Sequence, residues 1–219
     1  GDAVSICDAN VPSDMVLNND DIDDNCFSNI IDQCGVCDGD NSSCTGCPDE
    51  EAFNFDCYTG EIPPCNNDIT VDDGSCIYVP EKFSYNQSQQ QAFYIIQNAE
   101  IQQDEVEDLE ILTDWIGVFK DSVCVGAYPW IGYETTMPAM GFDGSSLTEN
   151  YLEIGDYPDF YIFDSSENTY YVAVASADVP WYNLVQPLIE NLNVFPDCAE
   201  VIDSPEVLQI IDEIPCRPR

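Results

Sequence analysis

Residues 21–32 place oxygen-bearing groups at the spacing of a calcium loop. Counted from Asp21 as position 1, these groups fall at positions 1, 3, 5, 7, 9 and 12, which are the ligand positions of an EF-hand-type loop. The candidate ligands are Asp21, Asp23, Asn25, the carbonyl of Phe27, Asn29 and Asp32. Cys26 stands where Gly is usual and Asp32 where Glu is usual, so a solvated acidic turn is the alternative.

Two further acidic stretches follow the loop. Asp38 and Asp40 flank a Gly in a compact turn, and Asp68 and Asp72 belong to an alternating run of oxygen-bearing side chains. We expect these four carboxylates to contribute Ca²⁺ ligands, because Asp suits tight ligand loops. The alternative is that they only form Asx turns.

Twelve cysteines in 219 residues predict disulfides rather than thiol chemistry. Two C-x-x-C pairs, Cys34–Cys37 and Cys44–Cys47, are separated by six residues. A zinc ribbon usually has 15–20 there, so zinc and iron–sulfur clusters are disfavoured. The predicted disulfide cysteines are Cys7, Cys26, Cys34, Cys37, Cys44, Cys47, Cys57, Cys65, Cys76, Cys124, Cys198 and Cys216.

The sequence leaves most of the disulfide connectivity open. Cys198 and Cys216 are expected to pair with each other. Nine cysteines precede residue 81, so one of them must pair elsewhere, stay free or link two chains. Cys124 lies in an apolar stretch and is either that missing partner or a buried thiol.

The composition argues against catalysis. The chain has no histidine, which removes Ser-His and Cys-His nucleophile systems and most catalytic zinc sites. Paired carboxylates could hydrolyse glycosides, but among 43 acidic residues their abundance is no argument for an active site. We therefore expect the protein not to be an enzyme.

The charge restricts the partners. The formal net charge is −39, of which −19 falls in residues 1–81 and −20 in residues 82–219. Such a field repels nucleic acid and anionic membrane surfaces and attracts cations, although adaptation to high salt would also produce it. No stretch of 18 apolar residues exists, so no membrane insertion is expected.

The elements that must hold these groups differ between the two parts of the chain. Residues 1–81 are rich in turn residues and predict a loop-rich segment that depends on disulfides and calcium. Residues 82–219 predict an antiparallel β-sandwich with a disulfide-bonded C-terminal tail, so the chain as a whole is mostly β. The predicted strands are Gln91–Ile96, Trp115–Phe119, Val123–Tyr128 and Tyr170–Ala175.

Two segments are ambiguous, and one aromatic cluster has two interpretations. Glu100–Leu112 fits a short helix or a connecting loop, and Val185–Leu192 is a second helix candidate. Tyr128, Trp130 and Tyr133 could form a sugar-stacking face, but packing in the core is the favoured interpretation because strand aromatics are usually buried.

Three stretches resemble known extracellular modules. Residues 32–44 (DQCGVCDGDNSSC) resemble a signature of modular secreted proteins, and residues 46–57 with 71–78 resemble a repeat of large secreted proteins of marine bacteria. The 21–32 loop is similar to thrombospondin type 3 and dockerin calcium loops. These resemblances imply an extracellular, repeat-bearing surface protein and no particular activity.

Together these features predict an extracellular or cell-surface protein. The favoured function is a structural subunit of a filament, sheath or surface layer, stabilised by calcium and disulfides, whose main partners are copies of itself. An adhesin or carbohydrate-binding module, with glycans or other surface proteins as partners, is the alternative.

Overall fold

The chain folds as two compact units. The computed structural model describes residues 26, 28, 30–102 and 106–194. The boundary between the units falls between Tyr78 and Val79. A loop-rich, disulfide-bonded unit is followed by a β domain, which confirms the predicted fold class. No helix among the described residues has the length and hydropathy to cross a membrane.

The regular elements are almost all strands, and most of them belong to the β domain. The first unit contributes β1 (Thr45–Gly46) and β2 (Val71–Asp72). The β domain contains η2 (Glu81–Phe83), β3 (Gln90–Gln102), β4 (Val106–Asp108), β5 (Trp115–Lys120), β6 (Val123–Pro129), β7 (Thr135–Gly141), η3 (Ser146–Thr148), β8 (Asp159–Asp164), β9 (Thr169–Ala175) and β10 (Leu188–Val194).

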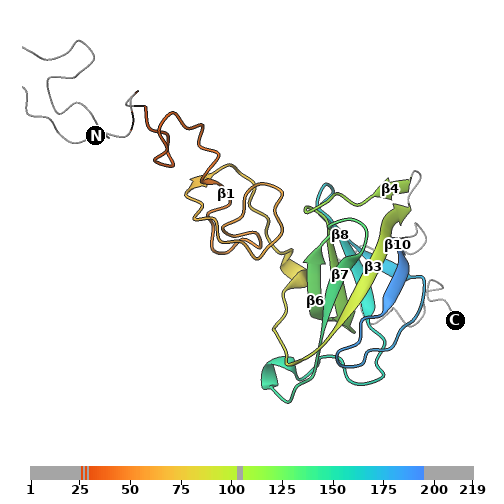
Figure 1. The fold of residues 1–219 in the computed structure, drawn as a ribbon. Helices are drawn as coiled ribbons and strands as arrows, with labels where there is room; N and C mark the ends of the chain where they lie inside the picture. The colour runs from red at the N-terminus through yellow and green to blue at the C-terminus, as the bar shows by residue number, and fades with distance from the viewer. Residues whose placement is uncertain (1–25, 27, 29, 103–105, 195–219) are drawn as a thin grey trace, which may run out of the picture. The chain divides into compact units, whose positions relative to one another are not determined.

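The β domain is a single sheet that nearly closes on itself (Figure 1). Its strand order is β4-β3-β10-β9-β8-β5-β6, and β7 pairs with the first half of β3. The pairs are antiparallel as predicted, except that β10 and β3 run parallel. The parallel pair joins the first long strand of the domain to the last described strand.

β6 and β7 approach each other closely at Gly126. A Cβ atom on Gly126 would lie 1.8 Å from the carbonyl oxygen of Pro138 in β7. Only glycine allows two backbones to pass this closely. The two strands therefore meet although no ladder of hydrogen bonds joins them among the described residues.

The inner face of the sheet holds an ordinary hydrophobic core. Trp130, Met137, Ile162 and Leu192 are among its buried members. Trp181 lies in the loop before β10 and donates from its indole N–H to the Ala139 carbonyl at 2.9 Å. This core explains why the β domain needs no disulfide among its described residues.

In both β3 and β10, the alternation of buried and exposed side chains shifts by one residue, and the two shifts occur at paired positions. In β3 the buried positions shift from Ile96 to Ala99, and in β10 they shift from Ile189 to Leu192. The register Ile189↔Ile96 and Leu192↔Ala99 is unbroken across the shift. Both strands can therefore change phase without losing their pairing.

The helix expected at 185–192 is wrong, because residues Leu188–Val194 form β10. The phase change gives the strand buried positions three residues apart, which imitates the spacing of a helix. In the other ambiguous segment, residues 100–102 end β3 and residues 106–108 form β4, so no helix forms there among the described residues.

Candidate functional site

Four disulfides hold the first unit, which we call the cystine module (residues 26–78). They confirm bridges for eight of the predicted cysteines, as Cys26–Cys37, Cys34–Cys44, Cys47–Cys76 and Cys57–Cys65. The first two interleave along the chain, and the fourth is nested inside the third. This density of disulfides indicates an oxidising environment. Cys7, Cys198 and Cys216 lie outside the described residues.

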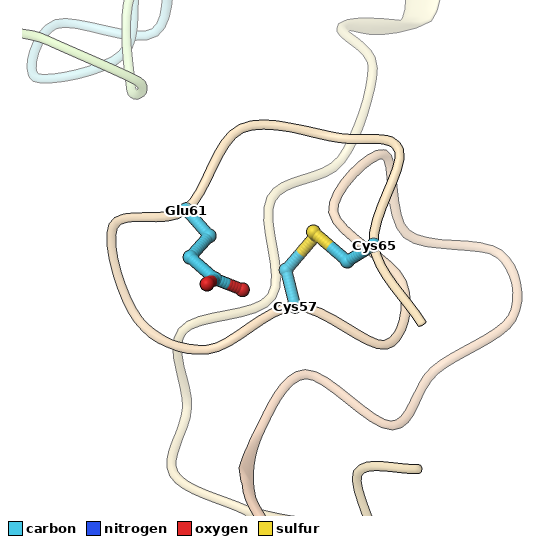
Figure 2. Close-up of side chains that lie close together, drawn as sticks. All are labelled: Cys57, Glu61 and Cys65. Atoms are coloured by element: carbon cyan, nitrogen blue, oxygen red, sulfur yellow. A yellow bond between two sulfur atoms is a disulfide. The ribbon is translucent and has the colours of Figure 1, made fainter. Parts of the chain in front are cut away.

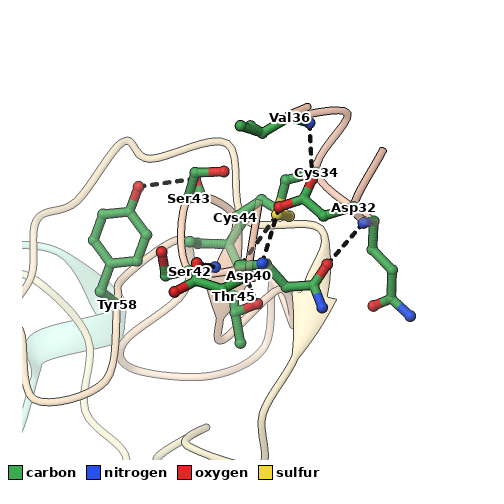
Figure 3. Close-up of a disulfide and its surroundings, with 12 residues drawn as sticks. Asp32, Cys34, Val36, Asp40, Ser42, Ser43, Cys44, Thr45 and Tyr58 are labelled. Atoms are coloured by element: carbon green, nitrogen blue, oxygen red, sulfur yellow. Dashed lines mark hydrogen bonds between the residues drawn. A yellow bond between two sulfur atoms is a disulfide. The ribbon is translucent and has the colours of Figure 1, made fainter. Parts of the chain in front are cut away.

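Asp32 organises the turn beside the Cys34–Cys44 disulfide (Figure 3). One carboxylate oxygen accepts from the Val36 backbone N–H at 2.8 Å, and the other accepts from the Asn41 N–H at 2.9 Å. Asp32 therefore serves the backbone of its own turn. The other predicted ligands of the 21–32 loop, Asp21, Asp23, Asn25, Phe27 and Asn29, lie outside the described residues.

Gly39 is packed directly against the Asp32 carboxylate. A Cβ atom at this position would lie 2.1 Å from Oδ2 of Asp32. The Asp-Gly pair at 38–39 thus has a steric reason in addition to its turn propensity.

The other predicted calcium ligands are separate turn residues in the structure. Asp38, Asp40, Asp68 and Asp72 are all exposed. Asp40 accepts from the Ser42 N–H at 3.1 Å, and Asp72 accepts from the Gly74 N–H at 2.8 Å, as in Asx turns. Their participation in calcium binding stays a prediction.

One cluster in the module has the residue types of a metal site. Among the described residues, Cys57, Glu61 and Cys65 are the only group of three or more His, Cys, Asp or Glu side chains whose ligand atoms lie within 4.8 Å of one another (Figure 2). The two cysteines are bonded to each other, so they offer no thiolate. Glu61 accepts from the Tyr58 N–H and from the Asn67 side-chain amide. This cluster is therefore a crosslinked turn.

Asn54 is a buried polar side chain that the sequence analysis did not single out. Its amide donates to the Ser75 carbonyl at 2.8 Å, and its Oδ1 accepts from the Ile77 N–H at 2.7 Å. Asn54 thereby fixes the backbone around the second half of the Cys47–Cys76 loop. In a segment full of Asp and Asn, no sequence signal distinguishes it from exposed turn residues.

Asp56 has the same function for the neighbouring stretch. Its two carboxylate oxygens accept from the backbone N–H groups of Asn67 at 2.9 Å and Ile69 at 2.6 Å. The residue is buried and has a positive φ of 61°. Buried polar side chains thus replace the missing secondary structure as partners for the backbone.

We expect Asp56→Asn to destabilise the module by about 1–3 kcal/mol, because an amide has one acceptor oxygen and would leave a buried N–H unpaired. Asp68→Asn is the matched control, since Asp68 also has a positive φ, of 54°, but is exposed. Hydrogen exchange at residues 67 and 69 measures the effect. Equal exchange in the two variants would contradict the assigned role of Asp56.

Hydrogen bonds lower the pKa of three surface carboxylates of the module, Asp40, Asp49 and Asp73. Hydrogen bonds from the Glu51 backbone and the Tyr78 hydroxyl lower the pKa of Asp49, and the same Asp49 contact is the largest cause that raises the pKa of Tyr78. Bonds from Ser75 and Thr59 lower the pKa of Asp73. These carboxylates therefore stay ionised to lower pH than an ordinary Asp, and their negative charge attracts cations.

Buried carboxylates also fix turns in the β domain. Asp114 accepts from the Glu110 N–H at 2.7 Å and from the Ser165 N–H at 2.9 Å. Asp164 accepts from the backbone N–H groups of Ser166 and Glu167. The two units therefore share one construction principle, in which acidic side chains satisfy the backbone of tight turns.

Cys124 does not form a disulfide, contrary to its place in the predicted set, and the buried-thiol alternative is correct. The side chain lies in β6 and donates to the Gly126 carbonyl at 3.5 Å. Burial raises the pKa of the thiol to about 12. Cys124 is thus a small apolar core residue rather than a reactive group.

We expect the Cys124 thiol to resist alkylation in the folded protein at pH 8, because roughly one molecule in ten thousand would carry the thiolate at four units below the pKa. The thiol should react fully in denaturant. Peptide mapping by mass spectrometry after iodoacetamide treatment measures both states. Complete labelling without denaturant would show that the thiol is accessible.

The three aromatics of the predicted sugar face do not form one exposed surface. Trp130 is 7% exposed and belongs to the core, while Tyr128 is partly buried against it. Tyr133 is exposed, and its hydroxyl accepts from the Gln97 amide at 2.7 Å. Core packing, the favoured interpretation, is therefore correct for Trp130.

Comparison of the chain with protein-family models, with curated proteins and with solved structures returned no match.

Proposed function

We propose that this chain is an extracellular structural protein, a subunit of a filament, sheath or surface layer. The proposal depends chiefly on the cystine module. There, four disulfides and carboxylates that accept from backbone N–H groups stabilise the fold in place of a large hydrophobic core. A unit built in this way tolerates proteases and changing solvent outside the cell, where disulfides persist. Its exposed residues include many carboxylates, among them Asp38, Asp40, Asp68 and Asp72.

Calcium is proposed as the counter-ion. The chain has 43 acidic and only 4 basic residues. Neighbouring copies would repel each other strongly unless cations neutralise their surfaces. Oxygen-rich turns with Kd values of about 0.1–1 mM are suited to extracellular calcium.

The β domain offers an apolar surface for a second copy. Ile154, Tyr157, Tyr182 and Leu184 are large exposed side chains. They lie on two loops that are tied together, because Gly155 N–H donates to the Trp181 carbonyl and Trp181 N–H donates to the Asp156 carbonyl. We call this surface the loop patch. Apolar side chains gathered on a charged protein favour association.

The test is assembly of the full chain, secreted in oxidised form, in millimolar CaCl2 and after addition of EGTA. Light scattering and electron microscopy should show polymers that form with calcium and dissolve in chelator. NaCl at matched ionic strength is the control for screening. A chain that stays monomeric at all calcium concentrations would overturn the proposed assembly. Equal assembly in NaCl would overturn the specific role of calcium.

Leu184 allows association to be separated from stability. Its φ is +64°, a region that Leu adopts only under strain, and its side chain is 72% exposed. We expect Leu184→Asn to raise the free energy of unfolding by a few tenths to about 1 kcal/mol, because Asn tolerates this conformation. The same change should weaken assembly. Urea denaturation and sedimentation measure the two effects, and a variant that assembles normally would exclude the loop patch.

A further inference from the structure

We propose that the chain is built to carry tension along its length: disulfides route the load past the loops of the cystine module, and a parallel strand pair resists it in the β domain. The inference deepens the proposed function, and its biological use rests on that function. The mechanical property itself belongs to the single chain.

The covalent path through the cystine module is short. From Cys26 it crosses to Cys37, returns three residues to Cys34, crosses to Cys44, continues three residues to Cys47 and crosses to Cys76. The three crossings span 5.3, 5.5 and 4.8 Å between Cα atoms. The taut path is therefore about 36 Å, whereas the same residues without disulfides would extend to about 170 Å.

The folded loops of the module lie off this path. Residues 27–33, 38–43 and 48–75 are bypassed, and the last of these stretches contains Asp56 together with both of its partners, the N–H groups of Asn67 and Ile69. Tension applied between the ends of the module is therefore not carried along the backbone of these loops, and the Asp56 bonds lie off the load path. The bonds from Val36 N–H to Asp32 and from Ile77 N–H to Asn54 join a bypassed loop to a residue on the path.

The β domain receives the load through β3 and β10. β3 is its first strand and β10 its last described strand, and the two are parallel over Leu188–Val194 and Ile95–Ile101 (Figure 1). Tension pulls β3 toward its N-terminal end and β10 toward its C-terminal end. In a parallel pair these directions are opposite along one ladder, so the strands are loaded in shear.

The bonded length of this pair exceeds the regular strand. Before β10, Leu184 N–H donates to the Gln91 carbonyl, and the Val185 and Pro187 carbonyls accept from Phe93 and Ile95 at 3.0 and 2.8 Å. In the middle, the Asn98 amide donates to the Glu190 carbonyl at 3.2 Å. We call residues 91–101 and 184–194 the clamp.

Shear loading makes the clamp strong because its hydrogen bonds must yield together. A ladder pulled from one end opens one bond at a time, whereas an evenly spaced parallel ladder in shear shares the force. The side chains of Ile96, Ile189 and Leu192 are fully buried and shield the core side of this ladder from water, while the Asn98 bond lies on the exposed side. The clamp should therefore be the mechanical barrier of the β domain.

Single-molecule pulling on the full oxidised chain, held by handles at its two ends, tests both parts. The expected trace contains unfolding of the β domain and no length released from residues 26–76. Reductant should add about 130 Å at low force, the difference between the two path lengths. Release of that length from the oxidised chain would overturn the disulfide part.

The clamp is tested by changing the direction of pull. With the second handle inserted between Asp121 and Ser122, at the tip of the β5–β6 hairpin, β10 is not loaded along its length. The unfolding force should fall by at least about twofold, because the clamp is no longer in shear. Equal forces in the two geometries would overturn the clamp.

A pair of variants separates mechanical from thermodynamic weakening. Asn98→Ala removes a bond inside the clamp, and Thr148→Ala removes a partly buried loop bond to Asp143 outside it. Asn98→Ala should lower the end-to-end unfolding force more than Thr148→Ala does, relative to their urea stabilities. Forces that follow urea stability alone would refute the clamp.

Failure of this inference and failure of the proposed function are distinguishable. A chain that resists force but never polymerises would refute the filament function and leave the clamp intact. A chain that polymerises with calcium but unfolds at equal force in both geometries would do the reverse.

Discussion

Gly126→Ala should be the most damaging single substitution in the β domain, with an expected loss of about 4 kcal/mol or more in the free energy of unfolding. The added Cβ would lie 1.8 Å from the Pro138 oxygen and 2.7 Å from its carbonyl carbon. Both are backbone atoms, so no side-chain rotation relieves the clash. β6 and β7 must separate, and the core between them opens.

Urea denaturation followed by tryptophan fluorescence measures this loss, because all three tryptophans lie in the β domain. Gly144→Ala is the control. Gly144 has a φ of +92° and open space around it, so alanine there costs about 1–2 kcal/mol through backbone strain alone. Similar losses in the two variants would mean that the contact between β6 and β7 adjusts, and the argument from close approach would be wrong.

The sequence correctly predicts strands whose residue types are typical of strands. β5, β6 and β9 are rich in β-branched and aromatic residues, and their predicted bounds agree with the structure to within one residue at each end. β3 was predicted only in its first half. Its second half carries polar Gln97 and Asn98 at the phase change, which interrupts the alternation.

β7 and β8 were also missed, for two different reasons. β7 contains Pro138, a residue that normally argues against a strand. Gly126 of β6 lies close to its carbonyl. A proline is tolerated there because β7 pairs only with β3 among the described strands, so its other edge needs no backbone donor. The sequence does not reveal which strands lie at an edge. β8 contains Phe160, Tyr161, Ile162 and Phe163, so its sequence has the same strand-forming residue types as β5 and β9, and the strand was simply overlooked.

The candidate site shows the same limit. Composition identified the cystine module and its need for crosslinks, because cysteine and aspartate counts do not depend on geometry. It could not separate Asp56, which is buried on backbone N–H groups, from Asp68, which is exposed. Nor could it pair the cysteines, since connectivity depends on which loops meet in space.

The module therefore depends on crosslinks in a way that the β domain does not. Besides the disulfide, the two ends of the Cys47–Cys76 loop are joined by the two-residue strand pair β1–β2, in which Thr70 and Val71 N–H donate to the Cys44 carbonyl and Asp73 N–H donates to the Gly46 carbonyl. Phe53 and Asn54 add one bond each to the Ile77 backbone. The β domain has a core of its own. Loss of one disulfide should consequently open the module while the other unit stays folded.

Replacing both Cys47 and Cys76 with alanine should cost the module about 3.5 kcal/mol, because the bridge closes a loop with a sequence separation of 29. Removal of Cys57–Cys65, with a separation of 8, should cost about 2.5 kcal/mol by the same relation. Hydrogen exchange across residues 48–77 measures both, and the tryptophan-detected transition should stay within about 0.5 kcal/mol of the parent. Protection that survives loss of Cys47–Cys76 would show that buried Asn54 and Asp56, rather than the covalent bridge, hold this loop closed.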